Sequence, residues 1–282
     1  MKILRSILTI SKLLALLVML LYQTVPAQEL MQVEGAISVG DSGALIPEAG
    51  TIRWNGKDFE GFNGFFWVPL SRISLGSVTD REGNEYKTLV IGNREWMVEN
   101  LRATVYNDST IIANIEDTLA WGLLGDPAYC WYANDRVTYE FPYGALYNWY
   151  AVDGGDLCPS GWWVPDASDF DDLIQAAMAY GNTGDARAAL QTTGSIDDGT
   201  GLWPDHIDGT NKTGWSGQPA GRRRDDGVFE GINVTGNFWS SVELGASTAE
   251  HRFLSSGNFA LTATSTNKKR GSGIRCVRLT AP

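Results

Sequence analysis

Residues 157–174 read Leu-Cys-Pro-Ser-Gly-Trp-Trp-Val-Pro-Asp-Ala-Ser-Asp-Phe-Asp-Asp-Leu-Ile. This stretch contains a complete helix start, because Pro165 precedes an Asp that can cap the first turn and further acidic residues follow it. Gly181 supplies the stop. The apolar side chains that recur at helical spacing are Phe170, Leu173, Ile174, Ala177 and Met178. The pattern predicts a helix over residues 166–180 with one buried face.

Shorter signals surround this helix. Residues 86–91 and 94–100 flank a Gly92-Asn93 turn and predict a β-hairpin. A second, short helix is expected near residues 185–191. The alternation over residues 273–279 predicts a terminal strand whose inward side chains pack in the core. The 32 Gly and 10 Pro favour many short elements joined by tight turns.

The composition limits the function classes. The 282 residues include 43% hydrophobic and 20% charged residues, a balance typical of a globular protein. A net charge of −11 argues against nucleic acid as a partner and against binding to an anionic membrane surface. With two His and three Cys, a zinc site of three or four such ligands is not expected. We expect neither a metal nor a cofactor.

The first 27 residues predict a signal peptide. Lys2, Arg5 and Lys12 precede the apolar run Leu13–Leu21, and Val25-Pro-Ala27 offers small residues for cleavage before Gln28. The alternative is a membrane anchor, which needs about 20 apolar residues. The run is shorter than that, so we expect export with no membrane span after cleavage, to a secreted, periplasmic or cell-surface location. The sequence contains no pattern that indicates how the protein would be attached to the cell surface.

Residues 28–73 have a different sequence pattern from the rest of the chain. Short alternating runs broken at Asn-Gly, as in Thr51-Ile-Arg-Trp-Asn-Gly56 and Phe59-Glu-Gly-Phe-Asn-Gly64, predict a small β-hairpin module. The segment resembles short β-modules of phage tail fibres and bacterial fibre-like proteins, in which three chains wrap together. That resemblance implies a homo-oligomer, a trimer, formed through residues 28–73. The alternative is an extension that packs on its own domain.

Residues 76–279 carry a specific resemblance. In order, the chain contains Asp80-Arg-Glu-Gly-Asn-Glu-Tyr-Lys-Thr88, Ile91-Gly-Asn-Arg-Glu-Trp-Met-Val-Glu-Asn-Leu101, Tyr143-Gly-Ala-Leu-Tyr-Asn-Trp-Tyr-Ala-Val152, Leu157-Cys-Pro-Ser-Gly-Trp-Trp-Val-Pro165, Phe238-Trp-Ser-Ser241 and Ile274-Arg-Cys-Val-Arg278. Together these motifs resemble the Fibrobacter succinogenes major paralogous domain, a family of exported bacterial proteins.

The resemblance implies an α+β fold of the C-type lectin-like kind, related to formylglycine-generating-enzyme domains. Such a domain has short twisted antiparallel strands, one clear and one short helix, and long irregular loops. In an oxidising compartment, three Cys allow one disulfide and one thiol. The resemblance favours Cys158–Cys276, which leaves Cys130 as an inert thiol. One departure is Trp163, where the family usually has His.

The sequence offers few of the residue patterns that an enzyme active site requires. Two His cannot supply a three-His iron site, and His206 and His251 stand in polar, loop-like contexts without a nucleophile motif. The paired acids Asp171-Asp172, Asp197-Asp198 and Asp225-Asp226 suit helix surface and turns better than glycosidase catalysis. Gln218-Pro-Ala220 lacks the carboxylate of a calcium-dependent sugar motif. We therefore expect no catalytic residues, although a calcium ion in a loop stays open.

The remaining candidate is the loop face over residues 202–270, which carries ligands in C-type lectin-like proteins. We expect Trp215 and Trp239 in the core, Arg222 paired to a carboxylate, and Lys268 and Lys269 in solvated turns. The expected ligand-binding residues are Trp203, Arg223, Arg224, Asp225, Asp226, Glu250, His251 and Phe259.

Three function classes follow from this face and from the N-terminal module. The leading one is an exported, adhesin-like, non-enzymatic protein that binds glycan or protein. The second is a fibre-tip protein oligomerised by residues 28–73. The third is an enzyme of the formylglycine-generating type.

Overall fold

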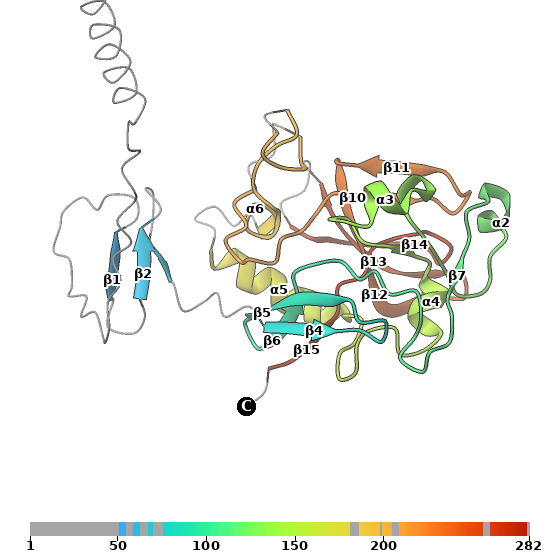
Figure 1. The fold of residues 1–282 in the computed structure, drawn as a ribbon, viewed down its shortest axis with the longest axis horizontal. Coiled ribbons are helices and arrows are strands. Elements are labelled where there is room, and N and C mark those ends of the chain that lie inside the picture. The colour runs from blue at the N-terminus through green and yellow to red at the C-terminus, as the bar shows by residue number, and fades with distance from the viewer. Residues whose placement is uncertain are drawn as a thin grey trace, which may run out of the picture. The chain divides into compact units, whose positions relative to one another are not determined.

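The computed structural model describes residues 51–54, 59–62, 67–69, 76–180, 186–197, 199–204, 209–255 and 260–280. The chain divides into two compact units, Met1–Ser71 and Arg72–Pro282 (Figure 1). In the first unit, three short strands form an antiparallel sheet: β1 (Ile52–Trp54), β2 (Phe59–Phe62) and β3 (Trp67–Pro69). The predicted signal peptide lies outside the described residues, and the oligomer stays a prediction.

The second unit mixes helix and sheet, with mostly strands, few helices and several small sheets, as the predicted α+β class requires. Its helices are α2 (Thr118–Gly122), the 3-10 helix η2 (Tyr132–Asn134), α3 (Arg136–Tyr139), α4 (Trp149–Asp153), α5 (Ala167–Met178) and α6 (Ala186–Leu190). None of the helices in the described part of the chain combines the length and the apolar character needed to cross a membrane.

The described strands of this unit form four sheets. The first has the order β15 (Val277–Leu279), β6 (Arg94–Met97), β5 (Glu85–Ile91) and β4 (Gly76–Thr79). The second is β12 (Thr235–Gly245), β13 (Thr248–Ser255) and β14 (Thr262–Asn267). The two smaller ones are β7 (Ala113–Asn114), β8 (Ala128–Cys130) and β9 (Leu146–Tyr147), and the pair β10 (Ala220–Arg223) and β11 (Phe229–Ile232). The predicted hairpin is confirmed as β5–β6.

Helix α5 confirms the prediction made from its cap and its apolar spacing. Asp166 accepts a hydrogen bond from the Asp169 backbone N–H, and Asp169 accepts one in return from the Asp166 N–H. Phe170, Leu173 and Ala177 are buried. Met178 is 37% exposed, so the buried face ends at Ala177, one residue earlier than expected.

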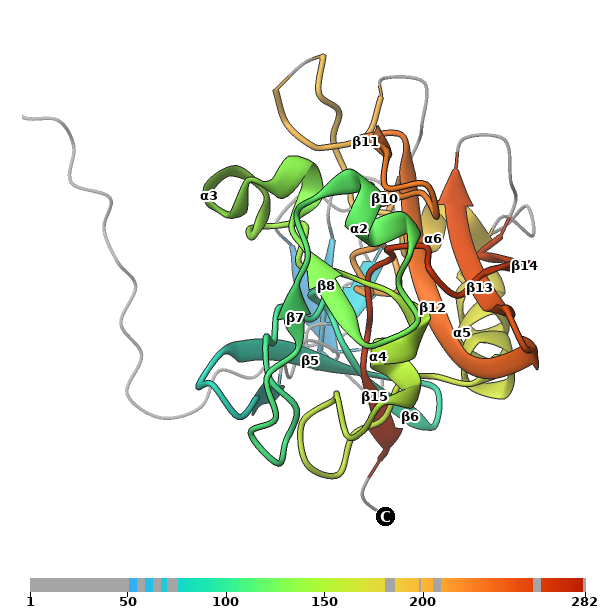
Figure 2. The ribbon, with the colours of Figure 1, turned by 90° about the vertical axis from the view of Figure 1, so that its right-hand side faces the viewer.

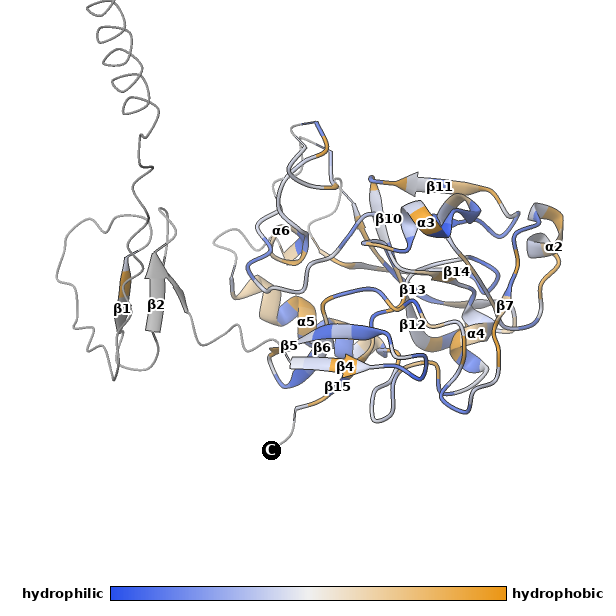
Figure 3. Cartoon of the chain, viewed as in Figure 1, coloured by the Kyte–Doolittle hydropathy of each residue, from blue (hydrophilic) through white to orange (hydrophobic). Residues whose placement is uncertain are grey.

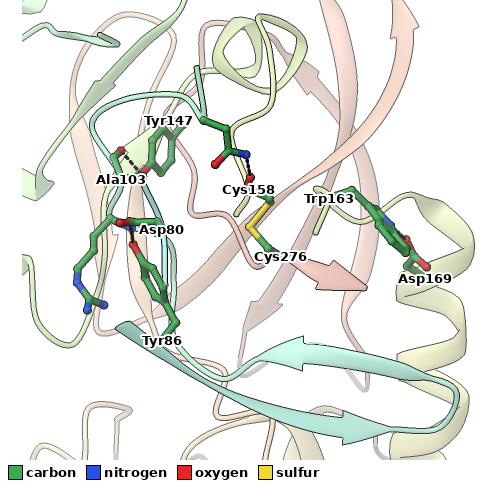
Figure 4. Close-up of a disulfide and its surroundings, with 10 residues drawn as sticks. Asp80, Tyr86, Ala103, Tyr147, Cys158, Trp163, Asp169 and Cys276 are labelled. Carbon is green, nitrogen blue, oxygen red and sulfur yellow. Dashed lines mark hydrogen bonds between the residues drawn. A yellow bond between two sulfur atoms is a disulfide. The ribbon is translucent and has the colours of Figure 1, made fainter. Parts of the chain in front are cut away.

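The disulfide follows the pairing that the resemblance favoured. Cys158 and Cys276 are bonded, with their Cα atoms 5.8 Å apart, and Cys130 is free and buried (Figure 4). Cys158 and Cys276 lie in one hydrophobic cluster with Trp239, whereas Cys130 lies in another, beside Trp121. Trp215 and Trp239 are fully buried, as expected.

Candidate functional site

A short hairpin and a neighbouring turn place three arginines on one face. β10 and β11 pair with Arg222 opposite Glu230, and Gly227, with φ +86°, closes the turn between them. Two backbone hydrogen bonds join Arg223 to Gly271, at 2.9 and 2.8 Å. This antiparallel bridge sets Arg270 beside Arg224. Figure 2 shows strands β10 and β11 next to each other. We call the side chains of Arg222, Arg224 and Arg270, with Asp225, Asp226 and Glu230, the arginine face.

Two of these arginines are neutralised locally. Arg222 forms an ion pair with Glu230 at 2.7 Å, as expected, and Arg224 forms one with Asp226 at 2.6 Å. Arg270 makes no side-chain hydrogen bond or ion pair with any described residue, and its Nε atom is buried. Burial and the charges of Arg222 and Arg224 lower the pKa of Arg270, although Asp225 and Glu230 act in the opposite direction. Guanidinium groups commonly pair with carboxylates and phosphates in proteins, so Arg270 is the candidate binding group of this face.

A buried imidazole lies near the arginine face. His251, on β13, is 1% exposed and packs edge-on against Trp239, with ring centroids 5.6 Å apart. Neither ring nitrogen has a hydrogen-bond partner among the described residues. Burial, reinforced by the charges of Arg270 and Arg222, holds the pKa of His251 well below its ordinary value. The ring is therefore neutral at pH 7.

His251 should make the fold sensitive to acid. Below about pH 6.5 the unfolded chain binds a proton at His251, whereas the folded protein leaves this ring neutral. The free energy of unfolding should therefore fall as the pH drops from about 6.5 to 5. Each pH unit should cost up to about 1.4 kcal/mol. His251→Phe removes the titrating group while keeping a flat ring beside Trp239. Urea unfolding at several pH values should show a flatter profile for this variant.

The chain's other histidine is the control for this measurement. His206→Gln should retain the wild-type acid dependence. A His251→Phe protein that loses stability with acid as steeply as the wild type would assign the effect to carboxylates instead.

Three expected ligand-binding residues are buried, which corrects their assignment to a solvent-facing loop. Trp203 is fully buried and donates its Nε1–H to Thr192 and Gly217. Arg223 is fully buried and donates to three backbone carbonyls. His251 stands in a strand and not in the loop that the sequence suggested. Side chains inside the core cannot reach a ligand at the surface.

The other expected ligand-binding residues lie in different places, and only some of them are on the arginine face. Arg224, Asp225 and Asp226 are exposed and lie together on the arginine face. Glu250 accepts a hydrogen bond from Arg252, which also pairs with Asp171 on α5, so Glu250 faces away from His251 along β13. Phe259 lies outside the described residues. Lys268, expected in solvent, is 5% exposed, paired with Glu243 and placed over the Trp149 ring.

Arg270 is the residue that sequence reasoning listed in the loop but left out of the candidate set. Its signal was the run Lys268-Lys-Arg270 in an acidic chain. Arg270 differs from its neighbour Lys269, which donates to the Gly122 carbonyl at 2.7 Å, because Arg270 has no such partner among the described residues.

Apolar side chains border the arginine face. Helix α2 ends against the Asp225-Asp226 turn, since a Cβ at Gly122 would lie 3.6 Å from the Asp225 carbonyl oxygen. Leu119 and Leu123 on this helix are 79% and 83% exposed. Figure 3 shows the hydrophobic colour on α2. The surface therefore combines cationic and aliphatic groups.

The remaining thiol is poorly suited to catalysis. Burial raises the pKa of Cys130 to about 12, although Arg223 nearby lowers it in part. The thiol therefore stays protonated at neutral pH, and the thiolate is the reactive form. Within the described residues, no group of three or more His, Cys, Asp or Glu is arranged to hold a metal ion.

The fold and the site define a disulfide-linked α+β domain with a surface that combines three arginines, three carboxylates and aliphatic side chains. The family model of the Fibrobacter succinogenes major domain matches residues 89–278, and the chain belongs to this family. No curated protein and no solved structure matches the chain.

Proposed function

We propose that the protein is an exported, non-enzymatic binding protein that recognises an anionic group of a glycan or protein ligand through the arginine face. The observation that carries this proposal is the Arg270 guanidinium, which is held beside Arg222 and Arg224 and has no partner in the part of the chain that the structure describes. Like charges placed side by side repel each other, and a bound carboxylate, sulfate or phosphate relieves that repulsion.

The geometry favours binding over catalysis. The protonated Cys130 thiol and the neutral, unpartnered His251 ring offer no activated nucleophile and no oriented base. The aliphatic border on α2 also suits a protein ligand, because Arg beside apolar side chains is typical of protein interfaces.

The proposal extends to the fold relation and the location. A C-type lectin-like arrangement is supported by the bridge that ties Cys158, just before α5, to Cys276, just before the last strand. The same bridge suits an oxidising compartment, in agreement with export. Surface display would make the molecule adhesin-like, and oligomers formed through residues 28–73 would raise the avidity of a weak single site.

Replacing Arg270 tests the arginine face. The full-length protein is screened against sulfated, uronic-acid and neutral oligosaccharides and against poly-glutamate, with and without a chelator. We expect binding to the anionic probes, weakened by salt. Arg270→Ala should weaken it more than tenfold, because a charge-assisted hydrogen bond contributes about 1.5–3 kcal/mol.

Arg81→Ala is the matched control, because this exposed arginine hydrogen-bonds Ser109 on another part of the domain. It should bind as the wild type does. Arg270→Lys keeps the charge without the planar fork and should show an intermediate loss. Equal binding by Arg270→Ala and the wild type would show that the arginine face takes no part in ligand recognition.

A further inference from the structure

Trp163 is a large aromatic side chain that the domain exposes and at the same time holds in one orientation. Its side chain lies at the surface, with 37% of the residue exposed. Its Nε1–H donates to the Asp169 carboxylate at 2.8 Å (Figure 4). Asp169 is itself fixed, because it belongs to the capping box of α5 and pairs with Arg94 at 2.6 Å. The indole ring is therefore pre-oriented by buried, hydrogen-bonded groups.

The backbone beneath the ring is equally well held. Trp163 and Val277 exchange two backbone hydrogen bonds, at 2.9 and 3.0 Å. Val277 belongs to β15, directly after Cys276 of the disulfide. The ring thus stands on an element covalently tied to the domain core, and such rigid support lowers the entropy cost of binding.

Polar groups stand near the ring. Arg94 reaches Asp172 at 3.9 Å with the end of its guanidinium, and the Asp172 side chain is 51% exposed. Leu279, 59% exposed, lies opposite Arg94 in the β15–β6 ladder. A partly exposed aromatic ring with a carboxylate and a guanidinium close by offers both an apolar surface and hydrogen-bonding groups.

We propose that Trp163 is a stacking platform for a pyranose ring of a neutral oligosaccharide, with Asp172 and Arg94 hydrogen-bonding the sugar hydroxyls. The C–H face of a pyranose is apolar and carries a slight positive charge, which matches the negative face of the indole ring. Uncharged sugar fits better than an anion, because Asp169 and Asp172 place two carboxylates against one arginine. This site goes beyond the proposed function and uses none of the residues of the arginine face.

The test uses the full-length protein and three probes: cellohexaose, xylohexaose and chitohexaose. The readout is the Trp163 indole N–H signal in a ¹H–¹⁵N spectrum, which Trp163→Phe assigns by its disappearance. We expect at least one probe to shift this signal, with a Kd on the order of 1 mM. Absence of any shift with all three probes at about 10 mM would overturn the proposal.

Two variants separate stacking from a structural role. Trp163→His keeps a ring N–H that can donate to Asp169 but loses the indole face, so it should retain the melting temperature and bind about tenfold more weakly. Trp163→Phe keeps an aromatic face without the hydrogen bond and should bind within a few-fold of the wild type.

Binding by these variants is measured by calorimetry, since they lack the reporting indole. Val137→Ala, at a residue that is 96% exposed on α3, is the control and should bind as the wild type does. If Trp163→His kept the wild-type affinity, Trp163 would have a structural role only and the stacking proposal would fail. The proposal would also fail if Trp163→His and Val137→Ala lost affinity equally.

Discussion

Replacing Cys158 and Cys276 together by Ser should lower the free energy of unfolding by about 4–5 kcal/mol. The disulfide spans 118 residues, so its removal restores a large loop entropy to the unfolded chain. Both sulfurs also lie in the core, where Ser hydroxyls would lack partners. Urea unfolding of the double variant and of the wild type, followed by tryptophan fluorescence, measures the difference.

The remaining cysteine is the control for the disulfide. Cys130→Ala removes a buried sulfur without affecting the bridge, and it should cost far less than the double replacement. Reducing agent should reproduce the loss in the wild type and leave the double variant unchanged. A double variant within about 1 kcal/mol of the wild type would contradict the entropic account.

Arg223→Ala should destabilise the domain by about 3–5 kcal/mol. The guanidinium donates to the carbonyls of Gly227, Ile115 and Glu116 at 2.5–2.9 Å and lies 4.4 Å from the centre of the Trp121 ring. Truncation leaves three carbonyl oxygens without their donor and opens a cavity. The midpoint of urea unfolding should shift accordingly.

The adjacent arginine provides a matched comparison. Arg224→Ala removes an exposed side chain paired with exposed Asp226, and it should change stability by no more than about 0.5 kcal/mol. Joint replacement of Arg223 and Arg224 is therefore no clean probe of binding, since the first residue holds the fold. Similar stability of the two single variants would place the Arg223 guanidinium in solvent.

Local signals made much of the fold predictable. The β5–β6 hairpin has its Gly92 at φ +64°, as the turn signal requires, and α5 begins at the expected capping Asp166. These elements are specified by residues a few positions apart, so composition and spacing suffice. The Cys158–Cys276 pairing needed the family resemblance, because three cysteines alone allow three pairings.

The interior polar groups were not predictable in this way. Arg223 meets two of its three carbonyl partners 107 and 108 residues away along the chain. His251 occupies an inward position of β13, where a binary pattern calls for an apolar residue. Flanking charges and glycines made both positions resemble surface turns. The position of Arg270 beside Arg222 and Arg224 likewise depends on strands distant in the sequence, so no local motif predicts it.

The place of β15 also determines when this domain can fold. The strand pairs with β6 near the start of the domain, and Val277 bonds the backbone of Trp163 in its middle. A nascent chain that has not yet reached residue 279 lacks this closing strand and the second half of its disulfide. Completion of the core therefore waits until residue 279 has been synthesised. Until then, β6 and Trp163 lack the strand that joins them.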